Sequence, residues 1–194
     1  MDSFENLLDI STKIHGHICA GQVIGVRMSM LGLERIGIDD PKGEDRKKLY
    51  VLVEIDRCAT DAIQSVTGCS LGKRSMRWKD FGIMAATFVN LETNRAVRIT
   101  ALEESRELSK KYYPALANKY QQQLEAYKIM PENELFAIQE VEVDIPQCDM
   151  PGRPMRRVCC EQCGDYVQDC REVEQEGTIL CRACAGERYY TVIS

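Results

Sequence analysis

Both histidines of this 194-residue chain lie in one heptapeptide, HGHICAG, at residues 15–21. His15 and His17 are two positions apart, so they share a side of an extended or turned segment but not of a helix. Cys19 follows two positions later. Neutral imidazole and thiolate both bind zinc and other transition metals, so this spacing predicts a compact chelating segment. The alternative is two structural histidines beside an ordinary cysteine.

A second segment, RCATDAIQSVTGCSLGKRS at 57–75, carries further reactive side chains. Cys58 falls between an expected strand and an expected helix, at a connection where functional groups are often placed. Asp61 lies in the first turn of that helix.

Two kinds of chemistry fit these residues, and the sequence leaves both open. The first is a transition-metal site in the core, whose predicted ligands are His15, His17, Cys19 and Cys58. The second is thiol chemistry, in which His17 activates Cys19 or Cys58 as a nucleophile. In the first case Asp61 is a candidate proton acceptor. The candidate catalytic residues are therefore His17, Cys19, Cys58 and Asp61.

The stretch Gly68-x3-Gly72-Lys73 has the composition of an anion-binding turn. It is one residue shorter than a phosphate loop and follows an expected helix rather than a strand. Cys69 and Lys73 are on this basis candidates for contact with a cofactor. A helix C-cap followed by a surface loop is the alternative interpretation.

Six of the ten cysteines lie between residues 159 and 184. The pairs CEQC (160–163) and CRAC (181–184) are separated by 17 residues, which is a zinc-ligand spacing. We predict a structural zinc held by the four thiolates of Cys160, Cys163, Cys181 and Cys184. Cys159 is an alternative to Cys160, although the two-residue gap favours Cys160. Cys170 is not an expected ligand.

The charge balance argues against a nucleic-acid partner. The chain carries a net charge of −5, and residues 151–194 contain six arginines, no lysine and seven acidic residues. Phosphate backbones require a basic surface, so we expect a structural or docking role for the tail. No apolar run is long enough to span a membrane, and the N-terminus lacks the basic region of a signal peptide. We therefore expect a cytoplasmic protein whose cysteines bind metal or take part in chemistry rather than form disulfides.

The elements that must position these residues follow from periodicity and breakers. Gly21 and Gly25 predict close approach of another backbone to the second helix. We expect helices at 3–14, 19–35 and 60–68, with Ser3 capping the first and Thr60 the third, and a helical stretch at 103–130 that is broken at Pro114. We expect strands at 49–56 and 135–145 and two strands within 81–102. This order predicts an α+β fold, an antiparallel-rich sheet with flanking helices, plus a small C-terminal zinc finger domain. The expected domains are a core at 1–148, a proline-rich linker at 149–157 and a zinc ribbon or treble clef at 158–194.

Three motifs occur in order: HGHICAGQVIGVRM, CATDAIQSVTGCSLGK and KDFGIMAATFV. Together they resemble the E-subunit family of formylmethanofuran dehydrogenase over about residues 10–145 of this sequence. The cysteine tail is also similar to that of some members. Ala20 stands where the family usually has proline, which loosens the turn but removes no ligand. The resemblance implies an α+β fold and a dimer. It also implies a cleft around a metal, with the shared residues His15, His17, Cys19, Cys58, Asp61 and Cys69.

The family name links the resemblance to a molybdenum- or tungsten-dependent enzyme that handles a one-carbon formyl group. One functional hypothesis is therefore a metal- or thiol-dependent protein of formyl redox metabolism, with zinc in the tail and a second transition metal in the core. The other is a non-catalytic accessory protein that docks on, or delivers metal or cofactor to, such a molybdenum or tungsten enzyme. We expect a homodimer in both cases.

Overall fold

The computed structural model describes residues 2–193. The chain forms two compact units, the first ending at Asp144 and the second beginning at Ile145. The predicted linker at 149–157 lies inside the second unit. Each unit is described by itself.

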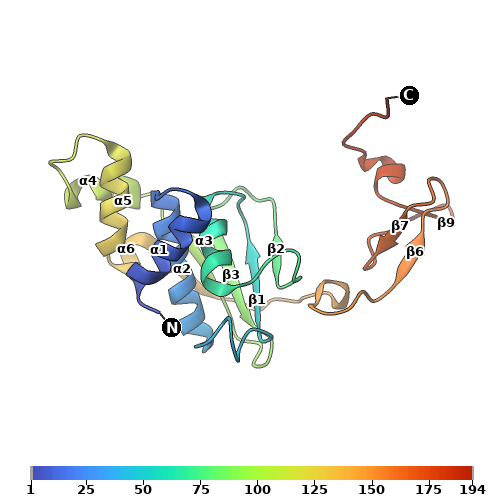
Figure 1. Ribbon diagram of the computed structural model, residues 1–194, viewed down its shortest axis with the longest axis horizontal. Coiled ribbons are helices and arrows are strands. Elements are labelled where there is room, and N and C mark those ends of the chain that lie inside the picture. Colours follow the sequence, from blue (N-terminus) through green and yellow to red (C-terminus); the bar gives the residue numbers. More distant parts are fainter. Residues whose placement is uncertain (1, 194) are drawn as a thin grey trace. The chain divides into compact units, whose positions relative to one another are not determined.

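The first unit contains one five-stranded sheet in the order β2-β1-β3-β4-β5 (Figure 1). The strands are β1 (Leu49–Val53), β2 (Met76–Trp78), β3 (Ala85–Asn90), β4 (Ala96–Ala101) and β5 (Phe136–Glu140). β1 pairs with β2 in parallel, and the other three pairs are antiparallel. The predicted α+β class with an antiparallel-rich sheet is confirmed. β2 was not expected from the sequence.

The helices of this unit are α1 (Phe4–His15), α2 (Ala20–Ile36), α3 (Cys58–Thr67), α4 (Ser105–Tyr112), α5 (Lys119–Ile129) and α6 (Glu132–Leu135). α2 is the central helix, since it contacts β3 and β4 of the sheet as well as α1, α3 and α5. Its side chains Val23, Val26, Met28 and Leu33 are fully buried in the hydrophobic core. α2 is thus held by its neighbours on several sides.

Local sequence sets where these helices begin and end. Ser3 caps α1 as predicted, accepting a hydrogen bond from the Asn6 N–H at 3.3 Å. Gly16 ends α1 in the left-handed conformation (φ 92°), which suits glycine because it has no Cβ. Cys19 is the N-cap of α2 and makes no side-chain capping bond. The predicted cap Thr60 was wrong: α3 begins at Cys58, and the Thr60 hydroxyl donates to the Ile55 carbonyl at 2.5 Å.

The predicted close approach at Gly21 and Gly25 is confirmed. A Cβ atom on Gly25 would lie 2.4 Å from the carbonyl oxygen of Ala59, and one on Gly21 would lie 2.9 Å from Cβ of Cys58. Both neighbours belong to α3. Only glycine allows α2 and α3 to pack at this separation, and the packing brings the start of α3 against the start of α2.

The second unit is built from two small hairpins (Figure 1). β6 (Arg157–Cys159) pairs with β7 (Tyr166–Gln168), and β8 (Val173–Gln175) pairs with β9 (Thr178–Leu180). A 3₁₀ turn, η1 (Gln147–Asp149), precedes them and a π-helical turn, η2 (Ala183–Glu187), follows.

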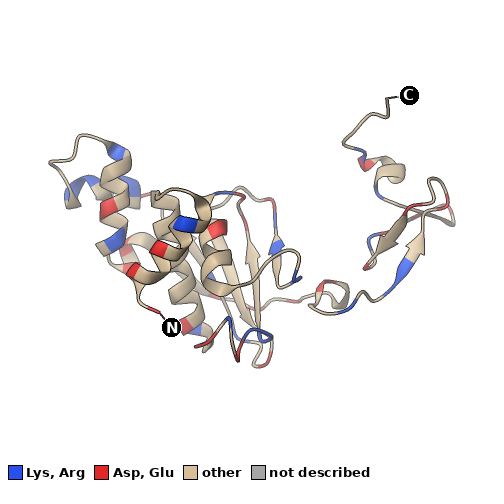
Figure 2. Ribbon diagram, viewed as in Figure 1, with Lys and Arg blue, Asp and Glu red and all other residues tan. Residues whose placement is uncertain are grey.

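Cys148 and Cys170 form a disulfide within the second unit. The expectation that the cysteines bind metal rather than form disulfides is therefore wrong for these two, although Cys170 is, as expected, outside the metal-ligand cluster. Lys and Arg are interspersed with Asp and Glu along both units (Figure 2). Among the described residues, none of the helices is both long and apolar enough to cross a membrane.

Candidate metal sites in the core and the tail

The core site is built where α1 ends and where α2 and α3 begin. His15 is the last residue of α1, and Asp61 lies in the first turn of α3. The His15 Nδ1 atom is 2.7 Å from Oδ2 of Asp61. A carboxylate only accepts hydrogen bonds, so in the neutral imidazole this contact places the proton on Nδ1 and leaves Nε2 as an electron-pair donor.

That Nε2 atom is the most informative atom of the site. Within residues 2–193 it is buried and has no hydrogen-bond partner. Ligand atoms of His15, His17 and Cys19 all lie within 4.8 Å of one another, and the two imidazole rings are 4.6 Å apart. Gly16 makes this possible, because its left-handed turn brings the residues on either side of it together. The structure thus brings His15, His17 and Cys19 together.

Cys58 stands beside this cluster rather than within it. Its thiol contacts that of Cys19, but its sulfur is not among the atoms that lie within 4.8 Å of one another. Burial raises the pKa of Cys58, and the hydrogen bond with the Cys19 thiol raises it further. A raised pKa keeps the metal-free thiol protonated, which does not favour a free thiolate nucleophile at this position.

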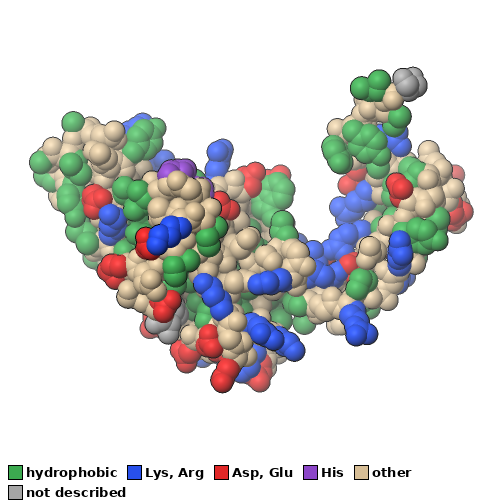
Figure 3. Space-filling view, in the orientation of Figure 1, with side chains coloured by type: hydrophobic (Ala, Val, Ile, Leu, Met, Phe, Trp, Pro, Cys, Tyr) green, Lys and Arg blue, Asp and Glu red, His purple; other side chains and the backbone are tan. Residues whose placement is uncertain are grey.

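A surface cavity of about 430 Å³ opens at the site. It is lined by His15, Asp56, Arg57, Cys58, Thr60 and Asp61. The histidine side chains reach the surface of the first unit in Figure 3, where they are drawn in purple. A small molecule therefore has access to the cluster.

Cys69 and Lys73 lie elsewhere. Cys69 is buried in the hydrophobic core, where its sulfur faces the Leu49 carbonyl oxygen and burial raises its pKa. The Lys73 ammonium donates to the Gly68 carbonyl at 2.9 Å, and Gly68 is the left-handed C-cap of α3. These contacts are those of a helix C-cap and a surface loop, the second interpretation of this turn.

In the second unit, ligand atoms of Cys160, Cys163, Cys181 and Cys184 all lie within 4.8 Å of one another. Cys160 rather than Cys159 belongs to this cluster. The exposed Cys159 sulfur instead faces the carbonyl oxygen of Gly164 at 3.5 Å. Cys160 and Cys163 lie in the loop between β6 and β7, and Cys181 and Cys184 follow β9.

The tail cluster already carries one stabilised thiolate. The backbone N–H groups of Cys163 and Cys181 lower the pKa of Cys160 to about 6. For Cys163, the Asp165 N–H lowers the pKa, but the neighbouring Cys160 sulfur and burial outweigh it and raise the value to about 12. Metal binding at this cluster therefore has to displace the proton of Cys163.

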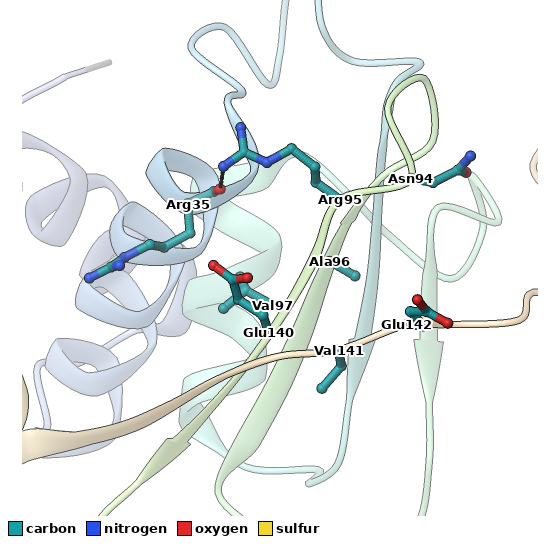
Figure 4. A pocket seen from close by; sticks show the side chains of 8 residues that line it. All are labelled: Arg35, Asn94, Arg95, Ala96, Val97, Glu140, Val141 and Glu142. Atoms are coloured by element: carbon teal, nitrogen blue, oxygen red, sulfur yellow. Dashed lines mark hydrogen bonds between the residues drawn. The ribbon is translucent and has the colours of Figure 1, made fainter.

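One other cavity, of about 390 Å³, lies at the C-terminal end of α2 (Figure 4). Arg95 arches over it and donates to the Arg35 carbonyl at 2.7 Å, while Glu140 and Glu142 line the β5 side. The cavity is lined by side chains of both charge signs, most of them exposed. The charges therefore favour neither an anionic nor a cationic ligand. The chelating cluster is at the opposite end of the helix.

Sequence reasoning missed Gln22. This amide is fully buried in the first turns of α2 and hydrogen-bonds to α1 and α3. A glutamine on a helix gives no pattern from which such a contact could be predicted.

The fold and the two clusters define an α+β protein with a histidine–cysteine group in its core and a four-cysteine group in a C-terminal ribbon. The sequence model of FmdE, described as "Molybdenum formylmethanofuran dehydrogenase operon", matches residues 14–142. This match covers more than half of the chain, and the chain belongs to the FmdE family.

Two similar proteins extend the comparison. A relative from Archaeoglobus fulgidus, named probable S-adenosyl-L-methionine-binding protein, is 30% identical over 210 residues, a match that covers 96% of this chain and 54% of that protein. The chain thus spans about half the length of this relative. A crystal structure of a tungsten formylmethanofuran dehydrogenase FmdE-like protein from Syntrophus aciditrophicus has a TM-score of 0.65 at 20% identity, covering 98% of this chain and 96% of that one. This likeness shows the fold.

Proposed function

We propose that this FmdE-family protein holds a transition metal in its core and a structural zinc in its tail, and that the core metal serves one-carbon formyl redox metabolism. The core donor set is two imidazoles and a thiolate, from His15, His17 and Cys19. Three protein ligands leave a coordination position open, which is the arrangement of catalytic rather than structural zinc sites.

The observation that carries the core proposal is the buried, unpartnered Nε2 of His15. Buried polar atoms almost always find a hydrogen-bond partner, and an imidazole nitrogen without one is suited to bind a metal. Here the Asp61 contact occupies Nδ1 and leaves the lone pair of Nε2 available to such a group. Histidine ligands of metals commonly donate their other ring N–H to a carboxylate in this way, so the residues present fit a bound metal.

With a metal bound, the protein supplies Lewis-acid chemistry at the open position. Asp61 orients the His15 ring and holds the proton on Nδ1, a role that accounts for the observed contact better than general-base catalysis does. Cys58 is a protonated thiol next to Cys19, available as a further ligand or as a proton donor to a ligand in the cavity. The cavity beside these residues admits a small substrate.

A non-catalytic accessory role is the second candidate, and the four-cysteine tail favours it. In this view the tail is the docking surface for a molybdenum or tungsten enzyme, in keeping with the operon in the family's description. We propose a cytoplasmic homodimer in either case. The ligand in the name of the Archaeoglobus relative is not carried over to this chain, because the match spans about half of that protein.

The test is metal content per chain by elemental analysis under reducing conditions. Wild type is expected to hold about two metals, and the double variant His17→Ala with Cys19→Ser about one. Cys159→Ser, which removes an exposed cysteine outside both clusters, is the matched control and should keep both. A core variant that retains as much metal as wild type would contradict the core site.

A further inference from the structure

We infer that Gln22 is the positioning residue of the core site: its side-chain amide sets the spacing of the three helices that present the ligands. The inference rests on the proposed core metal site. Gln22 is 0% exposed, and its Oε1 accepts a hydrogen bond from the hydroxyl of Ser11, which is itself 1% exposed. Its Nε2 donates to the carbonyl oxygen of Cys58 at 2.6 Å. One buried amide therefore joins α1, α2 and α3.

The place of these bonds along each helix gives the amide its role. Ser11 is one helical turn before His15 on α1, and Gln22 is about one turn after Cys19 on α2. Cys58 is the first residue of α3, one turn before Asp61. The amide thus lies one turn behind the cluster, where it fixes the separations on which the His15–Asp61 contact and the Cys19–Cys58 contact both depend.

An apolar side chain cannot replace this arrangement. Leucine has nearly the shape of glutamine but offers neither acceptor nor donor, so the buried Ser11 hydroxyl loses its partner and the Cys58 carbonyl loses a donor. The helices must then shift to solvate or re-pair these groups. Gly21 and Cys58 already approach closely, since a Cβ added at Gly21 would lie 2.9 Å from the Cβ of Cys58, and this leaves little room for such a shift.

A purely structural role for Gln22 predicts lower stability with an unchanged site, whereas a positioning role predicts a changed site. The chain offers a direct readout, because its only two histidines are both in the core cluster. Protein labelled with ¹⁵N-histidine reports the His15 tautomer in the metal-free state. Titration with Zn²⁺ against a competing chelator then reports affinity at the core alone, since the tail has no histidine.

The variants are Gln22→Leu and the milder Ser11→Ala, which removes only the α1 bond and serves if Gln22→Leu does not fold. Ser29→Ala is the matched control, because its buried hydroxyl bonds only to Gly25 O of the same helix, at 2.7 Å. We expect Gln22→Leu to lose the Nδ1–H signature of His15 and to bind Zn²⁺ about tenfold more weakly. Ser11→Ala should show a smaller change in the same direction, and Ser29→Ala none.

Unchanged His15 signals and unchanged Zn²⁺ affinity in both Gln22→Leu and Ser11→Ala would overturn the inference, whatever the melting temperature does. Wild-type histidine signals that do not respond to Zn²⁺ would instead overturn the proposed core metal. The tautomer measurement in the metal-free protein would then decide the role of Gln22 alone, so the two failures are distinguishable.

Discussion

Nδ1 of His15 lies 2.7 Å from Oδ2 of Asp61, and this contact joins the end of α1 to the first turn of α3 across 46 positions of sequence. The His15 side chain is 13% exposed, whereas that of Asp61 is 56% exposed. The carboxylate can therefore be changed with little effect on the core. A substitution at the exposed Asp61 should therefore change the orientation of the His15 imidazole.

The substitution Asp61→Asn is expected to weaken metal binding at the core by about 10- to 100-fold, because the carboxylate that orients the ligand is lost. Thermal stability of the metal-free chain should change little. The measurement is Zn²⁺ affinity read from the histidine resonances. Asp56→Asn is the control, since Asp56 lines the same cavity without a hydrogen bond to His15. Equal affinities for the two variants would count against the orienting role.

The proximity of His15, His17 and Cys19 could be predicted from the sequence, whereas the contacts that join them to other helices could not. The spacing His15-Gly16-His17 and the helix start at Cys19 follow from local rules, because a glycine in the left-handed region must interrupt a helix. The pairing of His15 with Asp61 and the bonds of Gln22 are long-range contacts. They depend on how α1, α2 and α3 pack, and no local pattern encodes that packing.

In the fold, too, features set by local sequence were predicted and those set by long-range contacts were not. Strands β1, β3, β4 and β5 were predicted because each carries several β-branched or apolar residues in succession. β2 has three residues, and its place depends on parallel pairing with β1. The Cys148–Cys170 disulfide was also missed, because connectivity depends on which chain segments meet and not on cysteine count.

The substitution Gly25→Ala should destabilise the first unit by about 1–3 kcal/mol through overpacking. The new Cβ would lie 2.4 Å from the Ala59 carbonyl oxygen and 2.6 Å from Cβ of Ala62, and neither neighbour can swing away. Urea unfolding followed by circular dichroism measures the effect. Gly72→Ala is the control, because no heavy atom lies within 4 Å of its added Cβ. A loss for Gly25→Ala no larger than that of the control would show that α2 and α3 are packed less closely.

Alkylation of Cys58 in the metal-free protein should require a more alkaline pH than alkylation of N-acetylcysteine. Burial and the Cys19 thiol raise the pKa of Cys58, and a raised pKa means that the reactive thiolate forms only as the pH rises further. The alkylation rate is measured for the Cys58 peptide by mass spectrometry at a series of pH values. The midpoint of this profile reports the pKa shift independently of how easily the reagent reaches the thiol. A midpoint below that of N-acetylcysteine would support the nucleophile hypothesis instead.

Cys160→Ser should abolish metal binding by the tail, because Cys160 belongs to the four-cysteine cluster. Cys159→Ser should leave metal binding intact, because Cys159 lies outside the cluster. Since metal binding supplies much of the folding free energy of so small a unit, Cys160→Ser should also make the tail sensitive to protease. Limited proteolysis with elemental analysis measures both effects. If Cys159→Ser also loses the metal, the assignment of the ligand is wrong.

Zinc affinity of the tail should rise steeply with pH through the neutral range. The pKa of Cys163 is raised to about 12, so this ligand is a thiol near neutral pH and zinc must displace its proton. Cys160, with a pKa lowered to about 6, is already ionised and contributes little to the slope. The measurement is chelator competition between about pH 6.5 and 8 in the background of His17→Ala with Cys19→Ser, which removes the core site. Each proton released per zinc gives about a tenfold change in affinity per pH unit, and a flat profile would mean that the remaining thiols are ionised before the metal arrives.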